Sequence, residues 1–188
     1  MPAERPTISM LDKEISRLER KKDYIRILWN SIVALTAIAA VTVLIFTLCL
    51  SINTVDGLSM APLLDDGQIV VALKSNKNIK QNDVVALYHN NKILIKRVIA
   101  VGNQTVDIGG NGVVYVDGKP LAEPYVPELS VGDCDIGLPF QTPDETFFVM
   151  GDNRPVSKDS RTNQIGVIGR DRIIGRVLFR VRPFSFIK

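Results

Sequence analysis

The sequence predicts a mainly β protein, in which a folded β-barrel or coiled-sheet domain follows one N-terminal transmembrane helix. Two observations carry this prediction. Residues 27–55 contain no charged side chain, and residues 56–188 hold short runs rich in Val and Ile, separated by Gly, Asn and Asp turns. We therefore divide the chain into an N-terminal segment (1–26), a membrane anchor (27–55) and a β-rich domain (56–188).

Composition excludes several classes of protein. The 188 residues include 23 basic and 20 acidic side chains, a net charge of +3 that is too small to indicate nucleic-acid binding. Two Cys and one His cannot supply the four ligands of a structural zinc site of the usual kind. The ordinary Gly, Pro and charge content excludes collagen-like and disordered chains.

The apolar run fits a membrane anchor. Its core, residues 31–52, would span about 33 Å as a helix, against roughly 30 Å of bilayer hydrocarbon. A buried core helix is seldom apolar on every face. A cleaved signal peptide has a shorter apolar region, followed by a small-x-small cleavage site that is missing here. We therefore expect an uncleaved signal anchor.

Charge on the two flanks predicts its orientation. Residues 1–26 hold seven Lys and Arg, whereas no basic residue follows the run until Lys74. The positive-inside bias then places residues 1–26 in the cytoplasm and residues 56–188 outside the cell membrane. Apolar residues in the first segment recur at roughly helical spacing, which fits either an amphipathic helix or a solvated tail.

Six strands are predicted beyond the anchor, and residues 122–145 read as a long surface excursion. Cys49 falls in the anchor and Cys134 outside, so the two cannot pair. The predicted strands are 69–73, 84–88, 93–101, 113–116, 146–150 and 173–181.

Two candidate reactive side chains follow the anchor. Ser59 lies in a Gly/Pro turn, where most Ser residues simply bond a backbone amide. Lys96 shares one strand face with Leu94 and Val98. If that face is internal, burial lowers the pKa of Lys96 and frees a neutral amine to act as a base. The alternative is an edge-strand Lys that reaches water.

A dense polar segment, residues 151–161, follows the apolar strand 146–150. A plain surface loop would explain it, but Asp159 and Arg161 could pair and leave Ser157 free to point elsewhere. His89 is the only imidazole. A Ser-His-Asp triad would need it, yet its place at a predicted hairpin tip favours a solvated ring.

These segments together resemble the type I signal peptidase family of membrane-bound Ser-Lys proteases. The resemblance covers the anchor and nearly all of residues 56–181. It rests on four motifs in order: Ser59-Met60-Ala61-Pro62, Lys96-Arg97-Val98-Ile99, the Asp117–Pro124 stretch and the segment Gly151–Arg161.

The resemblance implies that no metal and no cofactor are needed, and it implies a role for each matching residue. Ser59 is the expected nucleophile and Lys96 the general base. Ser157 is expected to orient the Lys96 amine. Asp159 and Arg161 are expected to support the loop, which Gly151 and Asp152 shape. Gly57 stands where some members have a Ser that helps the oxyanion hole, so a backbone amide near Gly57 or a water is expected as the second donor.

The implied function is removal of signal peptides, with small residues at −1 and −3, by a bacterial serine endopeptidase in the cell membrane. We expect a monomer that contacts the lipid bilayer. Two alternatives stay open from the sequence: a non-catalytic pilus-assembly relative and a protease dedicated to one substrate set. The first lacks the Ser or the Lys, and this chain has both. A soluble self-cleaving repressor of related fold is disfavoured by the anchor and by the segment Gly151–Arg161.

Ser59 follows Ile52 by only seven residues, so its Cα can lie at most about 25 Å from the end of the span. We therefore expect the site to face the outer surface of the bilayer. Leu58, Met60 and the aromatic C-terminal segment 183–187 are candidates for contact with substrate or lipid, the alternative being that they pack inside the domain.

Overall fold

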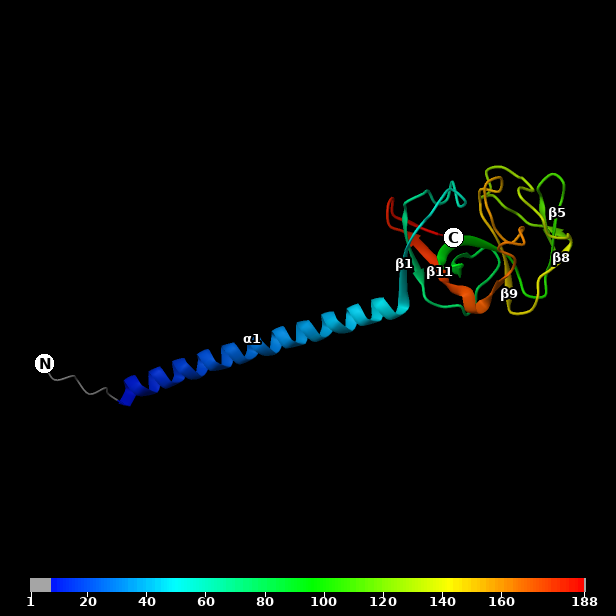
Figure 1. Cartoon of the computed structure of the whole chain (residues 1–188). Coiled ribbons are helices and arrows are strands. Elements are labelled where there is room, and N and C mark those ends of the chain that lie inside the picture. The colour runs from blue at the N-terminus through cyan, green and yellow to red at the C-terminus, as the bar shows by residue number, and fades with distance from the viewer. Residues whose placement is uncertain (1–7, 188) are drawn as a thin grey trace. The chain divides into compact units, whose positions relative to one another are not determined.

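A computed structural model describes residues 8–187 and contains one long helix followed by a β unit (Figure 1). Helix α1 runs from Ile8 to Cys49, and its most apolar 18-residue window has a mean hydropathy of 2.7. By length and composition it is the one helix of the described residues that could cross a membrane. None of its side chains is buried, whereas the core helix of a soluble protein is mostly buried.

The helix bounds differ from the predicted span at both ends. The basic segment before the apolar run belongs to the same continuous helix, so of the two alternatives left open there the helical one holds from Ile8 onward. At the other end, Leu50–Thr54 forms strand β1 rather than a further turn of helix, because its backbone pairs in antiparallel register with Ile69–Leu73. The membrane boundaries within 27–55 remain a prediction.

The larger sheet carries the residues of interest. Its order is β1-β2-β11-β3-β4-β9-β10, with β12 pairing beside β11. Among the described strands, β1 and β10 end this path without pairing with each other, so the pairing fits the coiled, open sheet rather than a closed barrel. The strands are β2 (Ile69–Leu73), β3 (Val84–His89), β4 (Lys92–Val101), β9 (Thr146–Met150), β10 (Ile168–Gly169), β11 (Ile173–Arg180) and β12 (Ser185–Phe186).

A second sheet has the order β7-β6-β5-β8. Figure 1 shows β5 and β8 at the end of the β unit that is farthest from β1. One helical turn, η1 (Arg170–Arg172), precedes β11. The strands of this sheet are β5 (Thr105–Ile108), β6 (Val114–Val116), β7 (Lys119–Pro120) and β8 (Phe140–Gln141).

The prediction of a mainly β domain behind one N-terminal helix is confirmed, and all six predicted strands are present within about two residues of their expected ends. The strands that the sequence missed are short, or, like β1 and β5, lack a clear apolar alternation. Cys49 and Cys134 are both free thiols.

Three apolar clusters form the core. One combines residues of β2, β3, β4 and β11 with Met60 and includes Val70 and Ile95. A second packs Val85, Val98 and Phe147 together, and a third joins the two sheets through residues such as Ile99 and Val106. Strand β4 supplies a residue to each cluster, so it runs through the centre of the unit.

We predict that Gly175→Ala destabilises the β unit. Gly175 lies in β11, and a Cβ there would sit 1.9 Å from the Leu73 carbonyl oxygen of β2, which is backbone and cannot swing aside. Overpacking of this kind costs about 1–3 kcal/mol. The measurement is thermal unfolding, with Gly137→Ala as the matched control, because nothing lies within 4 Å of a Cβ at Gly137. Equal melting temperatures for the two variants would contradict the prediction.

Candidate active site

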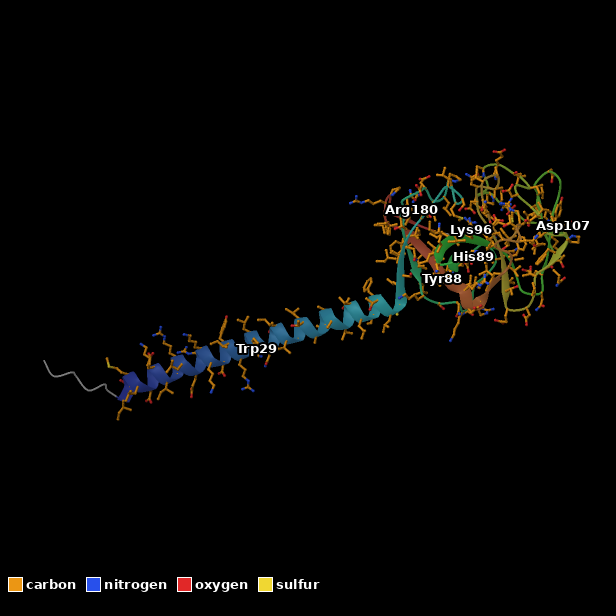
Figure 2. All side chains as sticks on the ribbon, in the orientation of Figure 1. Trp29, Tyr88, His89, Lys96, Asp107 and Arg180 are labelled. Carbon is orange, nitrogen blue, oxygen red and sulfur yellow. The ribbon has the colours of Figure 1, made fainter. Side chains whose placement is uncertain are left out.

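The Lys96 side chain is enclosed by the β unit (Figure 2). Strand β4 places Lys96 opposite Val85 and on the same face as Leu94 and Val98, which pack in one apolar cluster. The residue is 3% exposed, and its Nζ donates a hydrogen bond of 3.1 Å to Ser157 Oγ. The internal-face alternative therefore holds for Lys96, and its side chain does not reach water as the other alternative required.

Burial lowers the pKa of Lys96 from its ordinary value of 10.5 to about 8. Two nearby carboxylates, Asp159 and Asp152, act in the opposite direction, and Arg161 adds to the lowering. Each carboxylate is already paired with its own arginine, so neither forms an ion pair with Lys96 among the described residues. The amine is therefore only weakly held in its charged form.

The 151–161 loop is fixed by the buried pair Asp159–Arg161. Arg161 Nε donates to Asp159 Oδ1 at 2.8 Å, and Nη2 donates to Oδ2 at 2.9 Å. Arg161 Nη2 also reaches the Ser157 carbonyl at 3.1 Å. Because both side chains are fully buried, this geometry holds the segment that presents Ser157 to Lys96.

Gly151 is the point where the Ser59 segment meets this loop. A Cβ at Gly151 would lie 2.3 Å from Ser157 Oγ and 2.4 Å from the Ser59 carbonyl oxygen, so no larger residue fits. The Ser59 carbonyl also accepts a hydrogen bond of 3.0 Å from the Asn153 amide. Ser59 is thus held by its backbone beside Ser157, while its hydroxyl makes no hydrogen bond within the described chain.

The residues around Ser59 differ in exposure. Met60 is 1% exposed and packs in the core, so the alternative of internal packing holds for it. Leu58 stays exposed. Gly57 adopts a positive φ of 82°, and its amide donates to Asp66 Oδ1 at 2.7 Å. In this conformation the Gly57 amide is therefore not free to serve as a second oxyanion donor.

The sequence analysis missed two further buried ion pairs. Arg97 donates to both Asp152 oxygens, at 2.8 and 2.7 Å, and Arg154 makes two hydrogen bonds to the Glu123 carboxylate. One signal was that both arginines lie in motifs that are otherwise apolar or rich in turn residues. The partner of each lies 55 or 31 residues away, beyond any local pattern.

His89 does not behave as predicted. It ends β3, but both ring nitrogens are buried and have no hydrogen-bond partner among the described residues, so the ring is not a solvated tip. The register places it opposite Lys92 at the start of β4. No hydrogen bond joins His89 to Ser59 or to a carboxylate in the described chain, so the geometry does not assemble a triad.

We predict that Lys96→Met stabilises the fold near pH 7. The lowered pKa means that the folded protein holds the Lys96 proton less tightly than the unfolded chain, at a cost of about 3 kcal/mol while the amine is charged. That cost is full below about pH 8 and fades between pH 8 and 10.5. The stability gain of Lys96→Met should therefore shrink over this window in chemical unfolding followed by circular dichroism. A gain that does not change with pH would contradict a buried, titrating Lys96.

Comparison with known proteins identifies the family. Residues 28–182 match the family model described as signal peptidase, peptidase S26. Signal peptidase IB of Staphylococcus aureus is 38% identical over 154 residues, covering 72% of this chain and 79% of that protein. Signal peptidase I of Bacillus amyloliquefaciens is 31% identical over 170 residues, covering 85% and 90%. A solved signal peptidase I from Enterococcus faecalis, 24% identical, covers 54% of this chain and 98% of its own with a TM-score of 0.45. The chain belongs to the signal peptidase family, peptidase S26, and is a peptidase, as its four motifs predicted.

Proposed function

We propose that this protein is a membrane-bound signal peptidase I, which removes signal peptides from exported preproteins with Ser59 as nucleophile and Lys96 as general base. The observation that supports this most strongly is the buried Lys96 amine. It has a lowered pKa, its hydrogen bond goes to Ser157, and the Ser59 backbone lies beside that same Ser157 across Gly151.

The chemistry follows from these positions. A Ser hydroxyl is a weak nucleophile until a base takes its proton, and a neutral buried Lys can be that base. Ser59 Oγ would attack the scissile carbonyl, and Lys96 would then pass the proton to the leaving amine. Water activated by Lys96 would release the acyl group from Ser59. The Ser59 amide would donate to the developing oxyanion.

An extended peptide fits the free strand edges beside Lys96. Strand β9 pairs with β4 only from Arg97 onward, so among the described strands residues 92–96 have a neighbour on the β3 side alone. Strand β1 likewise pairs only with β2. A hollow of about 370 Å³ lies between residues 52–56 and the start of β4, at Lys92 and Ile93. A substrate strand added to such an edge would run toward Lys96.

The outer face of the larger sheet supports contact with the bilayer. One row across four strands consists of Ile52, Val71, Phe179 and Phe186, and Phe184 packs against both phenylalanines of that row. Ile52 is 72% exposed and Phe186 67% exposed, whereas Val71 is buried. We name these five residues the apolar row. Its first strand, β1, starts directly after the last residue of α1, so the length of the chain limits how far Ile52 can lie from the end of a span formed by α1.

The proposal also includes the orientation in the membrane, the substrates and the oligomeric state expected from the sequence. The N-terminus would be cytoplasmic and the β unit extracytoplasmic, because the basic residues precede the span. The substrates would be preproteins with small residues at −1 and −3, and the enzyme would act as a monomer in the bacterial cell membrane. A dedicated substrate set would use the same residues, and substrate profiling separates it from general processing.

We predict that Ser59→Ala and Lys96→Ala each reduce preprotein cleavage on the order of 10⁴-fold, since the two residues act as one unit. The measurement is processing of a model preprotein by the detergent-solubilised full-length enzyme. His89→Ala should cleave at the wild-type rate, because no hydrogen bond links His89 to Ser59. Cleavage by either of the first two variants at more than a trace rate would refute the proposed pair.

We predict that kcat/KM rises with pH through about 8 and then levels off. Only the neutral Lys96 amine accepts the Ser59 proton, and the neutral fraction grows as the pH passes the pKa of Lys96. The measurement is a pH–rate profile between pH 6 and 10 with a short peptide substrate. A flat or falling profile between pH 7 and 9 would exclude Lys96 as the base.

We predict that the apolar row touches lipid. The only Trp of the chain is Trp29, so Phe184→Trp in a Trp29→Phe background reports on the row alone. Its fluorescence in bilayer discs should be quenched by lipids brominated near the headgroup. The matched control is Tyr115→Trp on β6, in the sheet farthest from β1, which should not be quenched (Figure 1). Equal quenching at both positions, or none at Phe184→Trp, would contradict this contact.

A further inference from the structure

The start of the 122–145 excursion lies on the loop that presents Ser157. The Glu123 carboxylate accepts a hydrogen bond of 3.1 Å from Arg154 Nη1 and a second from Nη2. The Glu123 side chain is 3% exposed and that of Arg154 is fully buried. A buried ion pair with two hydrogen bonds neutralises both charges and also fixes the orientation of the two side chains, because the guanidinium plane must align with the carboxylate.

Arg154 also bonds to Gly151, the residue at which the Ser59 segment meets the 151–161 loop. Its Nε donates to the Gly151 carbonyl at 3.1 Å, while the Gly151 amide donates to Asp159 Oδ2 at 3.0 Å. Both backbone groups of Gly151 are therefore held by buried side chains. Since Gly151 touches Ser157 Oγ and the Ser59 carbonyl, a shift at Gly151 would move both serines relative to Lys96.

Tyr125, two residues after Glu123, covers the second missed ion pair. Its ring lies 3.9 Å from the Arg97 guanidinium carbon, and Arg97 in turn holds Asp152, the residue that follows Gly151. The Tyr125 hydroxyl lies 3.1 Å from Asn82 Oδ1 and 3.2 Å from Glu123 Oε1, and it donates to one of them. The ring separates the Arg97–Asp152 pair from solvent on this side.

We propose that Glu123 and Tyr125 are positioning residues for the peptidase reaction, which hold the Gly151–Arg161 loop against Lys96 through Arg154 and Arg97. This proposal rests on the proposed function of Ser59 and Lys96, and it adds the excursion to the machinery. Neither residue reaches Lys96 itself, and each acts through an arginine that bonds to the loop.

Loss of the Glu123 or the Tyr125 contact should change the pKa of Lys96 in one direction, and that change can be measured. If the loop withdraws from Lys96, water replaces the protein around the amine. Burial is the largest cause of the lowered pKa, so the pKa of Lys96 then moves back up toward its ordinary value. A purely structural role would lower the melting temperature and leave the titration of the folded enzyme unchanged.

The test compares Glu123→Gln and Tyr125→Ala with wild type in the full-length, detergent-solubilised protein. Acetic anhydride labels Lys96 only when the amine is neutral, and mass spectrometry follows the labelled fraction from pH 6 to 10. We expect the labelling midpoint of both variants to lie above the wild-type value of about 8. We also expect kcat for a peptide substrate to fall on the order of 10²-fold, with a smaller change in KM, as for a displacement of about 1 Å.

One matched variant should leave both readouts at wild-type values. Glu145→Gln makes the same change as Glu123→Gln, but in the exposed Glu145–Arg170 pair. Tyr125→Ala keeps the side chains of both the Arg97–Asp152 and the Arg154–Glu123 ion pair. It therefore tests the positioning proposal if Glu123→Gln fails to fold.

A wild-type labelling midpoint in folded Glu123→Gln and Tyr125→Ala would overturn the proposal, whatever their melting temperatures. If the midpoints move but the wild-type protein cleaves no preprotein, the proposed function fails, while the effect of Glu123 and Tyr125 on the surroundings of Lys96 is still established.

Discussion

The site depends on an ammonium group that is kept out of water without a carboxylate bonded to it. Burying a charge is costly unless it is paired, so an isolated buried amine gives up its proton more readily. Here Lys96 has charged groups nearby, but the carboxylate oxygens of Asp159 and Asp152 each accept hydrogen bonds from an arginine. The hydrogen bond that Lys96 makes goes to the neutral Ser157 hydroxyl. This arrangement brings its pKa close to physiological pH while leaving polar groups nearby.

The fold supplies this environment in two parts. Strand β4 passes through all three core clusters, which makes the Lys96 backbone rigid and excludes water on one side. The Gly151–Arg161 loop closes the other side, and its shape is set by buried ion pairs rather than by regular secondary structure. Such pairs add little net stability, because desolvation offsets their attraction, but they define one geometry. The site therefore combines a lysine on a rigid strand with a polar loop whose geometry is set by buried ion pairs.

Much of this could be predicted from the sequence, and the limits have physical causes. Strands with clear alternation or continuous apolar runs were predicted correctly, as were the Asp159–Arg161 pair and the hydrogen bond between Lys96 and Ser157, because these residues lie in short local motifs. The catalytic roles of Ser59 and Lys96 stay a proposal. Strand β1 was taken for helix because its residues continue the apolar run, and only pairing with β2 distinguishes it. The pairs Arg97–Asp152 and Arg154–Glu123 join distant segments, and with 23 basic and 20 acidic residues no local rule selects the partners. The burial of the His89 nitrogens likewise depends on tertiary packing.

The most direct test of the central claim is to trap the acyl-enzyme. The full-length protein would be mixed with a short peptide ester whose acyl part ends in Ala, quenched in acid within the first turnover, digested and examined by mass spectrometry. The account predicts one acyl group, on the Ser59 hydroxyl, which forms faster as the pH rises through 8 and is missing from Lys96→Met. Acylation at another residue, or equal acylation of Ser59 in Lys96→Met, would contradict it.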